Sequence, residues 1–167
     1  MDEIVPPQQK IKTLAELGGL VAAAHAAGKR VALANGCFDL LHVGHIRYLE
    51  AAKDLADILI VAINDDTSVR LLKGKARPLQ NQLDRAEVLA SLACVDFVII
   101  FDTPTVAPVL EALHPDFHAK GTDYTEETVP ERQTVASYGG RTVIAGDRKS
   151  HSSRNLIAQI TSRGRPR

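Results

Sequence analysis

The chain has 167 residues, of which 45% are hydrophobic and 24% are charged. This composition is ordinary for a soluble globular protein, and the length suits one domain with a substantial core. The 20 basic residues equal the 20 acidic residues, and only 4% of the residues are aromatic. This balance argues against nucleic acid or an anionic membrane surface as the partner, so any anion must be held by a local site.

The cysteines and the amino terminus bear on the cellular compartment. Cys37 and Cys94 show no local pairing pattern, which argues against a disulfide framework. The first residues lack the basic and apolar segments of a signal peptide, and no apolar run approaches the length of a membrane span. We therefore expect a cytoplasmic protein with no membrane partner.

Helical and strand-like segments alternate along the chain, beginning with an Ala-rich helix that ends at Gly28. Strands are expected at 31–34, 58–63, 97–101, 116–119 and 141–145, and helices at 14–27, 44–55, 67–72, 81–92, 105–113, 130–138 and 152–162. The strands are apolar through most of their length, as strands covered on both faces are. Alternation with short links predicts a doubly wound, parallel α/β sheet in a single domain spanning 1–167, with 1–12 and 163–167 as loose ends.

The most informative segment is 35–45, which follows the first expected strand and ends in His42-Val43-Gly44-His45. The two histidines stand where a helix begins, and helix amino termini attract phosphate through unpaired N–H groups and the helix dipole. Imidazoles there can donate hydrogen bonds to charge that develops on a phosphorus centre. The missing side chain of Gly44 gives a ligand room to lie against the helix backbone. The segment therefore predicts phosphate chemistry.

The two histidines also allow two simpler interpretations. A histidine at a helix start can be a cap or a solvated side chain, and histidine pairs on one helix face also bind zinc. No third ligand stands nearby in a recognisable metal spacing, and the two cysteines lie far apart in the sequence. We therefore predict no metal site built from the protein's own side chains.

Polar, cationic and glycine residues gather where the expected strands end. In doubly wound sheets, ligands bind outside the carboxyl ends of the strands, where the strand order reverses. The residues concerned are Asn35, Gly36, Phe38, Asp39, His42 and His45 after the first strand, and 64–66, 73–78, 120–124 and 147–153 after later ones. The pattern predicts a binding site along one edge of the sheet.

The run 35–49 resembles the signature of the cytidylyltransferase-like nucleotidyltransferases. More narrowly, the segments 72–78, 84–87, 95–96, 115–116 and 119–124 are similar to the heptose-1-phosphate adenylyltransferase domain of bifunctional ADP-heptose synthesis proteins. The resemblance covers nearly everything from Lys10 to Ile160. It implies a Rossmann-like fold that transfers AMP from ATP to a sugar 1-phosphate, giving ADP-heptose and pyrophosphate. It also implies Mg²⁺ with the ATP, and a homodimer.

The resemblance also implies roles for individual residues. The catalytic set is His42, His45, Lys73 and Arg85. The nucleotide-binding set is Asn35, Gly36, Cys37, Phe38, Asp39, His42, Gly44, His45, Lys120, Gly121, Asp123, Ser152 and Ser153. Asp39 is expected to organise the site rather than to act as a base, and Lys120 and Asp123 to border the acceptor. Ser152 and Ser153 are equally consistent with simple helix caps.

The sequence departs from the family pattern in places that concern the acceptor. His151 and Arg154 enter a motif of small residues before the last helix, and Thr122 stands where glycine is usual. Two alternatives therefore stay open. One is a sister enzyme that uses CTP with glycerol 3-phosphate or ATP with FMN, and the other is a non-catalytic nucleotide-binding module.

Overall fold

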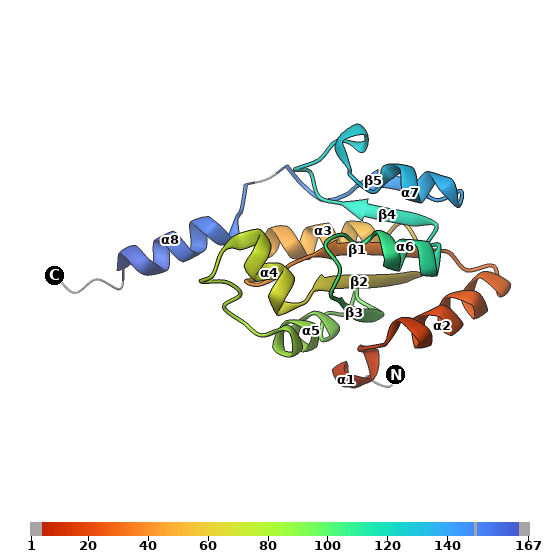
Figure 1. Cartoon of the computed structure of the whole chain (residues 1–167), viewed down its shortest axis with the longest axis horizontal. Helices are drawn as coiled ribbons and strands as arrows, with labels where there is room; N and C mark the ends of the chain where they lie inside the picture. Colours follow the sequence, from red (N-terminus) through yellow and green to blue (C-terminus); the bar gives the residue numbers. More distant parts are fainter. Residues whose placement is uncertain (1–4, 149, 164–167) are drawn as a thin grey trace.

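A computed structural model describes residues 5–148 and 150–163. Five parallel strands form one sheet in the order β3-β2-β1-β4-β5 (Figure 1). The strands are β1 (Val31–Gly36), β2 (Ile58–Asn64), β3 (Phe97–Phe101), β4 (Phe117–Lys120) and β5 (Arg141–Ile144). The predicted parallel, doubly wound sheet in a single domain is confirmed.

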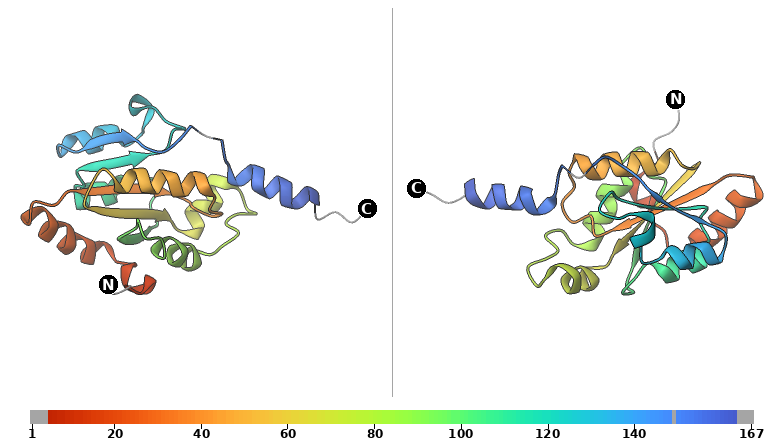
Figure 2. Two further views of the ribbon diagram at one scale, coloured as in Figure 1. Left: turned by 180° about the vertical axis from the view of Figure 1, so that it is seen from behind. Right: turned by 90° about the horizontal axis from the view of Figure 1, so that it is seen from above.

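Helices cover both faces of the sheet, and Figures 1 and 2 show α3 and α6 on opposite sides of it. The helices are α1 (Pro7–Lys10), α2 (Leu14–Ala26), α3 (Val43–Lys53), α4 (Asp66–Lys73), α5 (Gln82–Ala90), α6 (Ala107–Leu113), α7 (Arg132–Ser137) and α8 (Ser153–Arg163), with a 3₁₀ turn η1 (Glu126–Thr128). Alternate strand residues enter two apolar cores, one with α3 and α5 and one with α2, α6 and α7. Both faces are buried, which explains why the strands are apolar throughout.

The strand order reverses beside β1. The chain passes from β1 through β2 to β3 on one side, and then crosses to β4 and β5 on the other. β1 and β4 are paired in parallel, with Ala34 opposite Ala119, so their carboxyl ends lie side by side. This is the switch point at which α/β sheets of this kind place their ligands.

Part of the segment expected to be a loose amino-terminal end is packed against the sheet. Ile11 forms a parallel bridge with Val98, and the Lys12 N–H donates to the Val98 carbonyl at 2.9 Å. The Lys10 ammonium donates to the Val95 carbonyl at 2.9 Å. β3 is an edge strand with unpaired backbone groups, and this segment satisfies some of them. The expectation is therefore wrong for residues 7–12, while residues 1–4 lie outside the described part.

At the other end, α8 projects away from the body of the molecule (Figures 1 and 2) and has no buried residue. Arg163, expected to begin a loose end, is the last residue of this helix, and residues 164–167 lie outside the described part. Among the residues that the structure describes, no helix is long and apolar enough to cross a membrane.

Candidate functional site

The two histidines of the central motif are brought together at the start of α3, next to the end of β1. Their ring centroids lie 3.9 Å apart with an angle of 28° between the planes. The His42 backbone N–H donates to Nδ1 of His45 at 3.3 Å. Because that nitrogen accepts, the neutral His45 ring carries its proton on Nε2 and can act as a donor there. The predicted pairing of the imidazoles at a helix start is thus present in the structure.

The Phe38 ring packs beside His45 of this pair. Its ring is buried, with its centroid 5.4 Å from that of His45 and 6.4 Å from that of Tyr48. The Tyr48 hydroxyl donates to the Ala119 carbonyl at 2.6 Å and so ties α3 to β4. A Cβ at Gly36 would lie 3.0 Å from the Phe38 ring, so glycine lets this ring pack closely against the backbone. Phe38 therefore supports the loop, and contact with a nucleotide remains a prediction.

The missing side chain of Gly44 leaves space that the His42 side chain of the protein itself occupies. A Cβ at this position would lie 3.0 Å from the His42 ring atoms and 3.5 Å from the Cβ of His151. We expected the space above Gly44 to admit a ligand, whereas in the structure the His42 imidazole lies against the helix backbone there. The close approach of that ring accounts for the glycine.

Asp39 joins the loop that follows β1 to the loop that precedes α5. Its buried carboxylate accepts from the Leu79 N–H at 2.8 Å, from the Gln80 N–H at 3.0 Å and from Nε of Arg77. Burial opposes ionisation of Asp39, but these hydrogen bonds outweigh it and hold the pKa of the carboxyl below its ordinary value. A carboxylate with every oxygen engaged is a poor base, so this geometry agrees with the predicted organising role.

Arg85 lies beneath the same loop. Its side chain is 0% exposed, and it donates to the Cys37 carbonyl at 2.6 Å, to the Gln80 carbonyl at 3.1 Å and to Asp66 at 2.9 Å. In the structure Arg85 thus supports the loop between β1 and α3, and its contact with the reacting groups remains a prediction.

Lys73 is exposed and lies at this edge, at the end of α4. Burial raises the pKa of the Cys37 thiol, and the positive charges of Lys73 and Arg85 oppose that rise, so Lys73 lies within electrostatic reach of the loop. The Cys37 sulfur contacts Asn64 Oδ1 at 3.7 Å. Lys73 therefore lies near this loop, where its contact with phosphate remains a prediction, and Cys37 is a half-buried neutral thiol.

A buried polar network joins β1 to β4 at the switch point. Asn35 Oδ1 accepts from Nε2 of His118 at 2.9 Å and from the Lys120 ammonium at 3.3 Å. Burial, with a smaller contribution from Lys120, lowers the pKa of His118 to about 3, so this ring is neutral and donates from Nε2. Burial also lowers the pKa of Lys120, while Glu131 opposes that shift. The network fixes the orientation of the Asn35 amide.

His118 is a contributor that the sequence analysis did not place in the site. A signal for it was available, because it stands two residues before Lys120 on the same strand and so faces the same side of the sheet. Arg77 lies in the segment 73–78 that the sequence predicts at this edge, but its ion pair with Asp39 carries no local signal, because the two residues belong to different loops.

The turn after β4 is tied to the segment that leads into α8. The Thr122 hydroxyl donates to the Asp147 carbonyl at 2.7 Å, and the Tyr124 N–H closes the turn on the Gly121 carbonyl at 3.1 Å. The Lys120 ammonium lies 4.7 Å from the centre of the Tyr124 ring. Gly121 and Asp123 therefore lie at the predicted edge, beside Lys120.

Both serines at the start of α8 are engaged locally. Ser152 Oγ accepts from the Asn155 N–H at 3.1 Å, as a helix cap does, and the Ser153 hydroxyl donates to the Leu40 carbonyl at 2.8 Å. Of the two interpretations left open, the structure shows the cap for Ser152. For Ser153 it shows a tether to the loop that carries His42, and phosphate contact by either serine remains a prediction.

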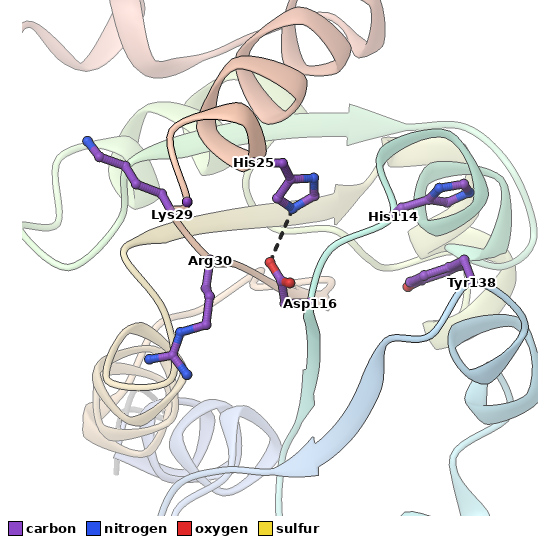
Figure 3. A pocket seen from close by; sticks show the side chains of 7 residues that line it. His25, Lys29, Arg30, His114, Asp116 and Tyr138 are labelled. Atoms are coloured by element: carbon purple, nitrogen blue, oxygen red, sulfur yellow. Dashed lines mark hydrogen bonds and ion pairs between the residues drawn. The ribbon is translucent and has the colours of Figure 1, made fainter.

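A separate hollow of about 420 Å³ lies at the opposite edge of the sheet (Figure 3), lined by His25, Gly28, Lys29, Arg30, His114, Asp116 and Tyr138. Asp116 accepts from the Val31 N–H at 2.8 Å and pairs with His25 at 3.1 Å. These contacts join α2, β1 and the start of β4. Because ligands of such sheets bind at the carboxyl edge, we assign this hollow a structural role.

The fold and this edge together define a class of protein. A parallel doubly wound sheet, with two imidazoles at a helix start beside the switch point, is a nucleotide- or phosphate-binding α/β domain. Residues 33–163 match the Cytidylyltransferase-like family. The chain belongs to that family.

Curated relatives agree with this assignment. "Bifunctional protein HldE" of Geobacter sulfurreducens is 46% identical over 151 residues, which are 90% of this chain and 31% of the relative. The protein of the same name from Caulobacter vibrioides is 45% identical over 157 residues, 94% of this chain and 32% of the relative. The chain thus spans about a third of the length of these relatives.

Solved structures share the fold. A lipopolysaccharide core biosynthesis protein from Thermoplasma volcanium superposes with a TM-score of 0.63 at 25% identity, over 73% of this chain and 100% of that one. A pantoate-beta-alanine ligase from Francisella tularensis, complexed with beta-gamma ATP and beta-alanine, gives 0.62 at 17% identity, over 92% of this chain and 76% of that one. The second likeness concerns the fold alone.

Proposed function

We propose that the protein transfers AMP from ATP to a sugar 1-phosphate, with D-glycero-β-D-manno-heptose 1-phosphate as the acceptor, and releases pyrophosphate. The observation that carries this proposal is the His42–His45 pair at the start of α3, beside the switch point of the sheet. The heptose assignment rests on the resemblance of 72–78 and 119–124 to heptose-1-phosphate adenylyltransferases. The 46% identity to HldE supports it.

The acceptor chemistry explains the kind of site that is present. The second pKa of a phosphate monoester is about 6, so the acceptor is largely ionised at neutral pH and needs no general base. An acceptor oxygen attacks the α-phosphorus in line, the new P–O bond forms, and the bond to pyrophosphate breaks. Catalysis then consists of positioning and of stabilising charge on the phosphate oxygens.

The side chains divide this work. His42 and His45 donate hydrogen bonds to the phosphates, and Lys73 supplies positive charge from the end of α4. Lys120 and Asp123 border the acceptor. Asp39 and Arg85 act through the loops that they hold in place.

The resemblance implies Mg²⁺ with the ATP, where it neutralises charge on the phosphates. Among the residues that the structure describes, no group of three or more His, Cys, Asp or Glu side chains could hold a metal ion. Asp39 is committed to Arg77 and two backbone N–H groups. This donor set fits a Mg²⁺ held mainly by the phosphates and water, which is a common way for proteins to bind it.

The resemblance further implies a homodimer, and the lack of a pairing pattern for the cysteines favours a cytoplasmic location. We include both in the proposal. Analytical ultracentrifugation of the purified chain tests the first, because a dimer gives a mass twice the chain mass of 18.1 kDa.

The reaction is tested by measuring pyrophosphate release with ATP or CTP, each crossed with heptose 1-phosphate, glycerol 3-phosphate and FMN. Turnover only with ATP and heptose 1-phosphate is the expected result. Turnover with another pair would keep the mechanism and replace the substrate. ATP binding with no turnover across the panel would identify a non-catalytic binding module instead.

A further inference from the structure

We propose that His151 is a third imidazole of the phosphate site and that it contacts the polyphosphate of the nucleotide. This inference rests on the proposed function and extends it to His151, for which the resemblance implies no role, because the family pattern has small residues in this motif.

The rings form a row. The centroid of the His151 ring lies 6.2 Å from that of His42, with 27° between the planes, and His42 in turn stacks on His45 at 3.9 Å. The Cβ of His151 would lie 3.5 Å from a Cβ at Gly44, so α3 and the segment before α8 meet over this glycine. His151 thus extends the line of imidazoles that begins at the first turn of α3.

The segment that carries His151 is anchored on both sides of it. The Ser153 hydroxyl is tied to the Leu40 carbonyl at 2.8 Å, which joins this segment to the loop that carries His42. On the other side, Asp147 accepts from Thr122 through its carbonyl and from Arg47 through its carboxylate at 2.9 Å. Although α8 itself projects from the body, these contacts hold the described residues on either side of His151 at the site.

The orientation of the ring leaves one nitrogen for a ligand. Nδ1 of His151 lies 2.8 Å from Oγ of Ser150, so that nitrogen is engaged within the segment. His151 is exposed, and when Nδ1 accepts from the serine the neutral ring carries a proton on Nε2. An N–H donor facing solvent beside two other imidazoles suits a polyanion. The nearest acid in the segment, Asp147, is already paired with Arg47.

Two His151 variants, H151A and H151Q, test the role. The dissociation constants of ATP and of pyrophosphate are expected to rise about 3- to 10-fold in H151A, as expected for loss of one exposed charge-assisted hydrogen bond. The inhibition constant of adenosine, which lacks phosphate, should stay unchanged. In the forward reaction the KM for ATP should rise by a similar factor while kcat changes less. H151Q keeps an N–H donor and should recover part of the loss.

His25 at the opposite edge provides the matched control, because H25A removes an imidazole far from the site. Unchanged ATP affinity in H151A would overturn the inference, and so would an equal loss of ATP and adenosine affinity, which would indicate a purely structural role. Wild-type turnover is measured in the same series. If the wild type binds ATP but transfers no nucleotide, the proposed function fails, whereas the binding comparison still decides the role of His151.

Discussion

At the scale of single residues, the polar side chains of this edge divide into those that are exposed or partly exposed and those that are buried and hold the loops. His42, His45 and Lys73 line the edge at which we propose phosphates bind. Asp39 and Arg85 are both buried, and their hydrogen bonds are made to neighbouring loops. Charge buried in this way is retained only when it is fully paired, because an unpaired buried charge is strongly destabilising.

The substitution His45→Ala is expected to lower kcat by about 100- to 1000-fold, the usual cost of losing one well-placed transition-state donor. The far-ultraviolet circular dichroism spectrum should stay the same, because the substitution leaves the apolar core of α3 intact. Steady-state pyrophosphate release is the measurement, with H25A as the control. Near-normal turnover in H45A would contradict the proposed role.

Arg85→Met removes three donors from beneath the loop and leaves Asp66 and two carbonyl groups without their partner. We expect the free energy of unfolding to fall by about 2–4 kcal/mol in urea titrations. Arg85→Lys keeps the charge but loses the planar fork, so it should recover only part of the stability. A variant that lost turnover at unchanged stability would instead support direct contact with the substrate.

At the scale of elements, the residues of the site gather at the carboxyl ends of β1 and its neighbours. Other segments of the chain cover the remaining borders of the sheet. Ile11 and Lys12 pair with β3 and α1 packs against α5, while Asp116 joins the starts of β1 and β4 at the far end. α8 contributes its first residues to the site and sends the rest of its length into solvent (Figure 1).

Ile11→Ala tests the packed amino-terminal segment. Ile11 is partly buried against the core and bridges Val98, so its truncation should lower the free energy of unfolding by about 1–2 kcal/mol. Val5→Ala is the matched control, because Val5 is 49% exposed and should change stability by less than about 0.5 kcal/mol. Equal stability of the two variants in urea titration would show that residues 7–12 contribute little.

At the scale of the whole molecule, the overall charge is neutral and the pH dependence of stability follows from a few buried ionisable groups. His118 is the clearest of them, because it is 0% exposed and its pKa is lowered to about 3. The unfolded chain binds a proton at this histidine near its ordinary pKa of about 6.5, whereas the folded protein does not.

The buried His118 makes the protein less stable at acidic pH. Between the folded and unfolded values the unfolded state binds more protons, so stability is fully present above about pH 6.5 and falls as the pH drops toward 3. Below about pH 6 this histidine alone should contribute a slope of up to about 1.4 kcal/mol per pH unit. Asp39, whose pKa is lowered, adds a loss only below its unfolded value of about 3.9.

Urea unfolding of the wild type and of His118→Gln between pH 4.5 and 7 measures this slope. The variant keeps a side chain that can donate to Asn35 but no longer titrates, so its stability should change less with pH over this range. Parallel curves for the two proteins would contradict the assignment of His118 as a buried neutral histidine.

The sequence by itself determined the parallel sheet, the places of its strands and the pairing of His42 with His45. These follow from local periodicity and from a motif whose members stand three residues apart. It also placed Asn35, Lys73 and Lys120 at the correct edge, because the carboxyl ends of parallel strands meet there.

Only the tertiary structure decided which of these groups hold the loops in place and which line the site. Arg85 reaches the Cys37 carbonyl from 48 residues away, and Arg77 reaches Asp39 from 38 residues away. No local pattern encodes such contacts, because they depend on how separate loops pack at the sheet edge. The packing of residues 7–12 on β3 and the approach of His151 to His42 have the same origin. Each joins segments that only the completed fold brings together.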